Sequence, residues 1–88
     1  MTRRDYAVAR RRMVDEQLRR AGVTDRPVLD TMARVPRHVF VPRMLWHRAY
    51  EPCALPIGFG QTISKPFTVG LMTALLELQG TERVLEVG

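Results

Sequence analysis

An amide and two hydroxyls lie directly ahead of a proline in the stretch Leu55-Pro56-Ile57-Gly58-Phe59-Gly60-Gln61-Thr62-Ile63-Ser64-Lys65-Pro66. Glycine allows a tight backbone path, and Gln61, Thr62 and Ser64 would stand at the N-terminus of a helix that begins near Pro66. Free N–H groups at a helix N-terminus favour anions such as carboxylates. The segment therefore has suitable chemistry for holding an acidic substrate. On spacing alone, a plainer interpretation is favoured, in which Ser64 only caps the helix.

A second candidate lies at the end of the sequence, where Val84-Leu85-Glu86-Val87-Gly88 is typical of a buried strand closed by glycine. In doubly wound sheets, ligands sit beyond the carboxyl ends of the strands, and glycine lets the backbone approach a cofactor closely. Glu86 and Gly88 are therefore candidate cofactor residues. Judged alone, the segment is more simply a plain strand end, and that interpretation is favoured.

Three helices are predicted to position these residues. Apolar residues recur at helical spacing from Tyr6, and Gly22 is placed to end that helix. Thr24 is a suitable N-cap for a second helix, which Pro36 would stop. The third helix would run from Pro66 to about Gln79, since a strong apolar pattern follows the proline.

A short turn after the third helix leads into the predicted strand over residues 83–87. A nearly continuous apolar strand in this position favours a parallel sheet covered by helices, so the predicted fold class is α/β. The chain divides into a helical region over residues 1–50, a shaped loop over 51–66, and a helix with the first sheet strand over 67–88.

Composition excludes several classes of protein. The 88 residues are 45% hydrophobic and 26% charged, which is ordinary for a globular domain. No apolar stretch approaches the ~18 residues of a membrane span, and no secretory signal follows the N-terminus. Cys53 stands alone, and His38 and His47 share no helix face, so neither a disulfide nor a metal site is predicted. These features indicate a cytoplasmic protein.

The net charge of +5 is concentrated in residues 1–50, which are rich in arginine. Such a distribution is most simply a solvated helix face. It leaves open an alternative function as a small basic nucleic-acid-binding module. That alternative does not explain residues 61–64.

The sequence resembles the protein-L-isoaspartate O-methyltransferase family along nearly its whole length. Gln61-Thr62-Ile63-Ser64 is the specific signature, whereas Val84–Gly88 is similar to a first methyltransferase motif that a wider superfamily shares. Further matching segments are Met13-Val14, Gln17-Leu18, Gly22-Val23, Val35-Pro36-Arg37, Phe40-Val41, Ala49-Tyr50 and Leu55-Pro56-Ile57-Gly58.

The resemblance implies a Rossmann-like methyltransferase fold that uses S-adenosyl-L-methionine. It implies that Ser64 is the active-site serine and that Gln61, Thr62 and Ile63 belong to the loop that closes over cofactor and substrate. The remaining residues implied to contact the cofactor are Val69, Glu86 and Gly88.

The implied reaction is transfer of a methyl group to the carboxylate of an isoaspartyl residue in a damaged protein. The resulting ester then collapses to a succinimide, which allows partial return to normal aspartate. The implied partners are isoaspartyl proteins and peptides, with no nucleic acid and no membrane, and the full-length enzyme would be a monomer.

Length is the main departure from the family, because its members continue well beyond the point where this sequence ends. The resemblance therefore implies the N-terminal part of a single, incomplete methyltransferase domain. We expect the 88-residue polypeptide by itself neither to bind the cofactor nor to transfer methyl groups. A third interpretation is a non-catalytic interaction fragment whose unpaired strand completes the sheet of a partner.

Overall fold

The chain begins with one long helical segment. The computed structural model describes residues 1–87, and in it helix α1 (Arg3–Met13) continues directly into a π-helical stretch, η1 (Val14–Arg19). Thr2 and Asp5 form a capping box, because each accepts a hydrogen bond from the other's backbone N–H, at 3.1 and 2.8 Å. Gly22 follows with a φ of 105°, so the predicted glycine termination is confirmed.

Helix α2 (Arg26–Arg34) lies beside α1 and ends before Pro36, as the sequence predicts. Its N-cap is Asp25, whose carboxylate accepts a hydrogen bond from the Val28 N–H at 3.2 Å. The predicted cap at Thr24 is therefore wrong by one residue. Asp25 is the better cap because the residue three places after Thr24 is Pro27, which has no N–H to donate, whereas Val28 can donate to Asp25. Two 3-10 turns follow, η2 (Arg37–Phe40) and η3 (Arg43–Arg48).

A β-hairpin lies within the predicted loop over residues 51–66. Strands β1 (Leu55–Gly58) and β2 (Gln61–Ile63) pair in an antiparallel arrangement, with Leu55 opposite Ile63. Helix α3 (Pro66–Leu75) follows and ends earlier than the predicted Gln79. Glu77 has a φ of 52°, in the left-handed region, so the backbone leaves the helical path before Gly80.

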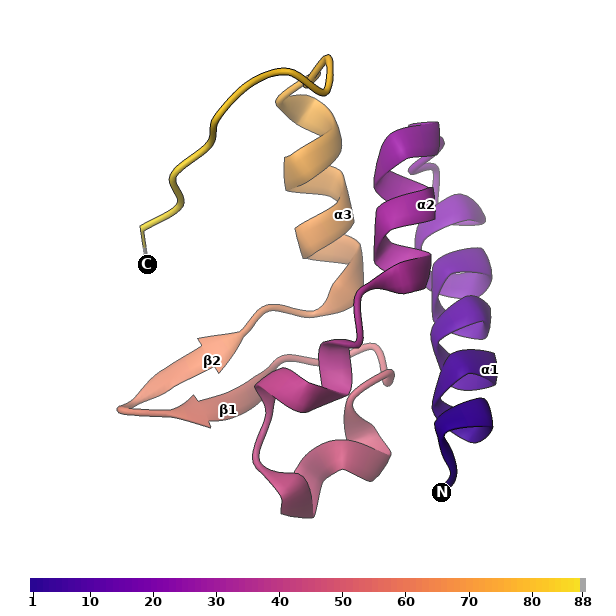
Figure 1. Cartoon of the computed structure of the whole chain (residues 1–88), viewed down its shortest axis with the longest axis vertical. Coiled ribbons are helices and arrows are strands. Elements are labelled where there is room, and N and C mark those ends of the chain that lie inside the picture. The colour runs from indigo at the N-terminus through magenta and orange to yellow at the C-terminus, as the bar shows by residue number, and fades with distance from the viewer. Residues whose placement is uncertain (88) are drawn as a thin grey trace.

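The three α-helices stand side by side, and the hairpin lies at the end of α3 where that helix begins (Figure 1). The segment after α3 runs back from the other end of the helix toward the hairpin (Figure 1).

Two clusters of buried side chains hold the elements together. One cluster joins α1 to the 3-10 turns and the hairpin through Met13, Val41, Ala49, Tyr50 and Leu55. The other joins η1, α2 and α3, and its buried members are Leu18, Val23 and Val28. The hairpin and α3 are therefore fixed to different parts of the core.

The structure has no strand over residues 83–87, where the sequence predicts one. Among residues 1–87, β1 and β2 are the only strands, and they pair with each other. A strand of a parallel sheet needs a neighbour for its N–H and C=O groups, and no neighbour is present in the described chain. The observed architecture is thus helices with a two-stranded antiparallel sheet, consistent with an incomplete α/β fold.

Candidate functional site

The hairpin turn determines where Gln61, Thr62 and Ser64 lie. Phe59 and Gly60 connect the strands with φ values of 54° and 69°, the backbone of a two-residue turn with both central residues left-handed. Leu55 is buried, and its partner Ile63 packs on the same cluster. Thr62 and Ser64, on either side of Ile63, are exposed.

The junction between β2 and α3 leaves the Ser64 hydroxyl free. Lys65 is the N-cap of α3, and no side chain caps that helix. Within residues 1–87 the Ser64 hydroxyl has no hydrogen-bond partner, and the residue is exposed. The interpretation of Ser64 as a simple helix cap is therefore not what the structure shows.

A cavity of about 550 Å³ opens beside this junction. Five of the predicted site residues line it, namely Thr62, Ile63, Ser64, Val69 and Glu86. They come from β2, the junction, α3 and the returning C-terminal segment, so residues far apart in sequence meet at one place. Gln61 does not line the cavity, and Gly88 lies outside the described residues.

The walls of the cavity are mostly apolar, with a few polar groups. Met13, Met32, Val35, Phe40 and Ile57 supply apolar surface. A volume of this size lies within the range of small-molecule sites, which combine apolar walls with a small number of placed polar groups. The arrangement can therefore surround an organic ligand and orient it through hydroxyl and carboxylate groups.

Sequence reasoning missed three polar residues of this cavity, Thr31, Thr73 and Arg37. The Thr73 hydroxyl already donates to the Val69 carbonyl at 2.7 Å. Arg37 is 6% exposed, which is unusual for an arginine. There was little signal for its burial in the sequence, because Arg34 and His38 lie close to it in an arginine-rich region.

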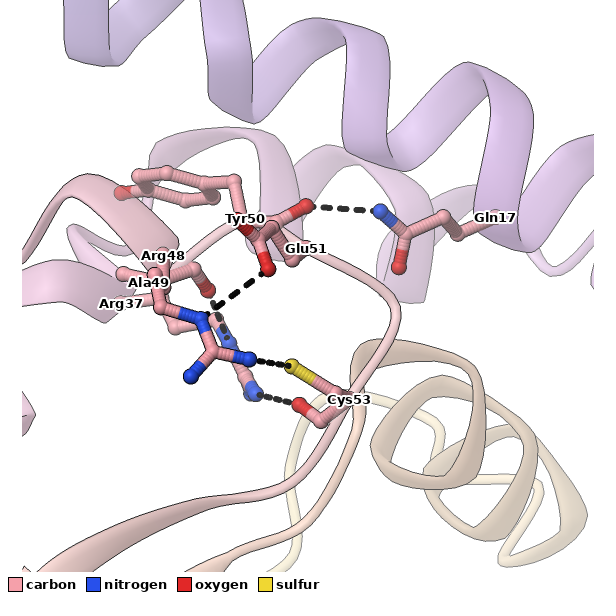
Figure 2. A network of polar contacts seen from close by, with 7 residues as sticks. All are labelled: Gln17, Arg37, Arg48, Ala49, Tyr50, Glu51 and Cys53. Carbon is pink, nitrogen blue, oxygen red and sulfur yellow. Dashed lines mark hydrogen bonds and ion pairs between the residues drawn. The ribbon is translucent and has the colours of Figure 1, made fainter. Parts of the chain in front are cut away.

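The Arg37 guanidinium is held by carbonyl oxygens. It donates to Ala49 O at 2.7 Å through Nε, and to Ser64 O at 2.8 Å and Cys53 O at 3.5 Å through Nη2. Figure 2 shows its contacts to Ala49 and Cys53, with Arg48 in front reaching Glu51 and the Cys53 sulfur. Burial lowers the pKa of Arg37, against a smaller rise from Cys53 and Tyr50. No described carboxylate pairs with this buried cation.

Neither a metal cluster nor a membrane-spanning helix occurs in the described part of the chain. No group of three or more His, Cys, Asp or Glu side chains there could hold a metal ion. No helix of residues 1–87 has the length and apolar character needed to cross a membrane.

Comparison with known proteins gives one consistent family. The family described as protein-L-isoaspartate(D-aspartate) O-methyltransferase matches residues 9–88. A protein-L-isoaspartate O-methyltransferase of Syntrophotalea carbinolica is 56% identical over 84 residues, which is 96% of this chain and 39% of the relative. An enzyme of the same name from Roseiflexus sp. is also 56% identical over 84 residues, 38% of its length. The chain thus spans less than half the length of these curated relatives.

Proposed function

The chain belongs to the protein-L-isoaspartate(D-aspartate) O-methyltransferase family, and from this premise we propose that it forms the substrate-facing part of a methyl-transfer site. The proposed reaction moves a methyl group from S-adenosyl-L-methionine to the carboxylate of an isoaspartyl residue in a damaged protein. One observation carries the proposal: Thr62, Ser64 and Glu86 line the same cavity.

An acceptor carboxylate is ionised near neutral pH, because ordinary carboxyl pKa values lie near 4. The proposed site therefore needs no strong general base. Its task is to align a carboxylate oxygen with the methyl group, and alignment of this kind accounts for a large share of many rate enhancements. The Ser64 hydroxyl, which has no partner among residues 1–87, is available to donate a hydrogen bond to that carboxylate.

The residues present are suited to one side of a cofactor site. Cavity walls of Met13, Ile57 and Val69 would contact apolar surface, and Glu86 offers a carboxylate to an amino group or a water. When bound, S-adenosyl-L-methionine would supply a methyl group activated on a sulfonium. Thr62 and Ile63 would cover the reacting atoms and exclude water.

We further propose that the complete enzyme has a Rossmann-like α/β sheet, with residues 83–87 as a strand and Gly88 in its cofactor turn. The exposed apolar side chains of that segment support this assignment, since Leu85 and Val87 are 88% and 87% exposed and a sheet would bury them. The substrate would be an isoaspartyl protein in the cytoplasm. No feature of residues 1–87 favours the nucleic-acid module or the interaction fragment.

A chimera tests the proposed function. Residues 1–88 of this chain would replace the matching part of the Syntrophotalea relative, and transfer of labelled methyl groups to an isoaspartyl peptide would be measured. An otherwise identical peptide with normal aspartate is the substrate control. We expect transfer to the isoaspartyl peptide alone. A folded chimera that binds S-adenosyl-L-methionine but transfers no methyl groups would overturn the proposal.

The role of Ser64 is tested in the same chimera. Ser64→Ala is expected to lower kcat about 10- to 100-fold, because the lost hydrogen bond is made to a charged group. Thr24→Ala is the matched control, since Thr24 is exposed and outside the cavity. Equal rates for Ser64→Ala and the unsubstituted chimera would remove Ser64 from the mechanism.

A further inference from the structure

Arg37 connects three segments that are separate in sequence. Its guanidinium donates to carbonyl oxygens at the end of η3, just before β1, and just after β2, which belong to Ala49, Cys53 and Ser64. It therefore holds both ends of the hairpin to the 3-10 turns. The residue sits in η2, where its own N–H donates to the Val35 carbonyl at 2.9 Å, so its backbone is also fixed.

The Ser64 junction has few other restraints. The ladder of the hairpin ends at Ile63, and α3 has no side-chain cap. In the part of the chain that the structure describes, the bond from Arg37 is the one tertiary hydrogen bond of Ser64. The path of the backbone at Ser64, and with it the direction of the hydroxyl, depends on this contact.

We propose that Arg37 is a positioning residue that holds the Ser64 junction and so directs its hydroxyl into the cavity. The structural half of this proposal is that Arg37 holds the Ser64 junction, and it is independent of the proposed function. The catalytic half is that Arg37 thereby directs the Ser64 hydroxyl, and it rests on the proposed function. Arg37 is suited to this task because its planar group offers several donors in a fixed geometry, which lysine cannot reproduce. Its burial and its carbonyl partners keep the contact away from competing water.

Arg48 provides a matched control a short distance away. Its guanidinium donates to Glu51 at 3.2 Å and reaches the Cys53 sulfur at 3.8 Å, but it does not contact Ser64 (Figure 2). Arg37→Lys and Arg48→Lys thus make the same chemical change to two arginines near Cys53. Only the first removes a contact to the junction.

Amide hydrogen exchange of the whole 88-residue chain tests the structural half. The Val69 N–H donates to the Lys65 carbonyl in the first turn of α3, and the Val23 N–H donates to the Leu18 carbonyl in the other cluster. We expect Arg37→Lys to speed exchange at Val69 about 10-fold and at Val23 less than about 2-fold, since one charged hydrogen bond is lost. Arg48→Lys should change neither.

Equal acceleration at Val69 and Val23, or none at either, would overturn the proposal. A second variant distinguishes loss of this contact from general destabilisation of the fold. In Arg37→Ala, added guanidinium should slow exchange at Val69 again, whereas added methylammonium should not, because only guanidinium reproduces the planar set of donors. Absence of this difference would also contradict the assignment.

A double-mutant cycle in the chimera tests the catalytic half. Arg37→Lys should lower kcat about 10-fold with little change in KM, and it should cost much less when Ser64 is already alanine, because both changes then act on one group. Additive losses would show that Arg37 acts only on stability. An inactive unsubstituted chimera would remove the proposed function, while exchange at Val69 would still decide whether Arg37 holds the junction.

Discussion

His38 lies in an aromatic cluster that favours its neutral form. Its ring stacks on Tyr6 with 4.1 Å between centroids, and Nδ1 lies 3.0 Å from the Tyr50 hydroxyl. Arg10 donates to that hydroxyl at 3.2 Å and cannot accept, which leaves the hydroxyl proton for an unprotonated Nδ1. Partial burial, and then repulsion by Arg10, lowers the pKa of His38.

This arrangement predicts that stability falls as the pH is lowered through the range of histidine titration. The pKa of His38 is lower in the folded chain than in the unfolded one, where it is about 6.5. Below that value the unfolded state takes up the proton first, so the free energy of unfolding decreases. Urea denaturation between pH 8 and pH 5 measures the effect. His38→Gln should flatten the profile in this range. A profile that His38→Gln does not alter would contradict the assignment.

The helical elements were largely predictable because local signals determine them. Apolar spacing, Gly22, Pro36 and Pro66 all act within a few residues, and the observed helices respect each of them. The misplaced cap at Thr24 had a local reason in the sequence. Aspartate is a better N-cap than threonine, and the residue three places after Thr24 is Pro27, which has no N–H to donate to a cap.

The hairpin and the C-terminal segment were not predictable in the same way. The turn uses Phe59 in a left-handed conformation that usually requires asparagine or glycine, so its sequence signal was weak. Residues 83–87 have the composition of a strand, but strand formation depends on a partner and not on propensity alone. For the site, sequence indicated Ser64 and Glu86, whereas the approach of Arg37 to Ser64 required the fold.

The packing of α3 on η1 depends on the absence of a side chain at Gly70. A Cβ atom there would contact the Leu18 side chain, with Leu18 Cγ at 3.1 Å and the Met32 sulfur at 3.4 Å. Leu18 is fully buried, so it has little room to move. The close approach of the two elements is what seals the second cluster of the core.

Gly70→Ala is therefore expected to lower the free energy of unfolding by about 1–3 kcal/mol, the usual cost of overpacking. At an exposed helix position the same substitution would stabilise the protein by up to about 1 kcal/mol. The sign of the change in the free energy of unfolding therefore shows whether Gly70 is closely packed. Denaturant unfolding measures it. Leu18→Val should reduce the loss when combined with Gly70→Ala, because it removes the δ carbons of Leu18, one of which the added methyl group would meet. A stabilising Gly70→Ala would disprove this description of the contact.

At the scale of the whole molecule, α3 has two apolar sides and uses only one. Pro66 and Gly70 are buried against the rest of the chain, whereas Met72 and Leu75 are 64% and 72% exposed. The segment that follows also exposes its apolar residues. Large apolar patches on a protein surface mark places where other structure packs. In the proposed α/β enzyme, the open side of α3 would cover the sheet that residues 83–87 join.

Because the segment that carries Glu86 is exposed, we expect the 88-residue polypeptide by itself not to bind the cofactor. Glu86 is carried on an exposed segment that makes no ladder within residues 1–87, so this side of the cavity is not fixed in place. A ligand would have to order that segment, and the lost conformational entropy would cancel much of the binding free energy. Calorimetric titration with S-adenosyl-L-methionine should show no binding at micromolar concentrations, and the methyl-transfer assay should show no activity. The chimera should bind in the same titration, because there residues 83–87 have a sheet to join. A micromolar isotherm for the 88-residue polypeptide would mean that the hairpin, α3 and Glu86 form a sufficient site without the sheet.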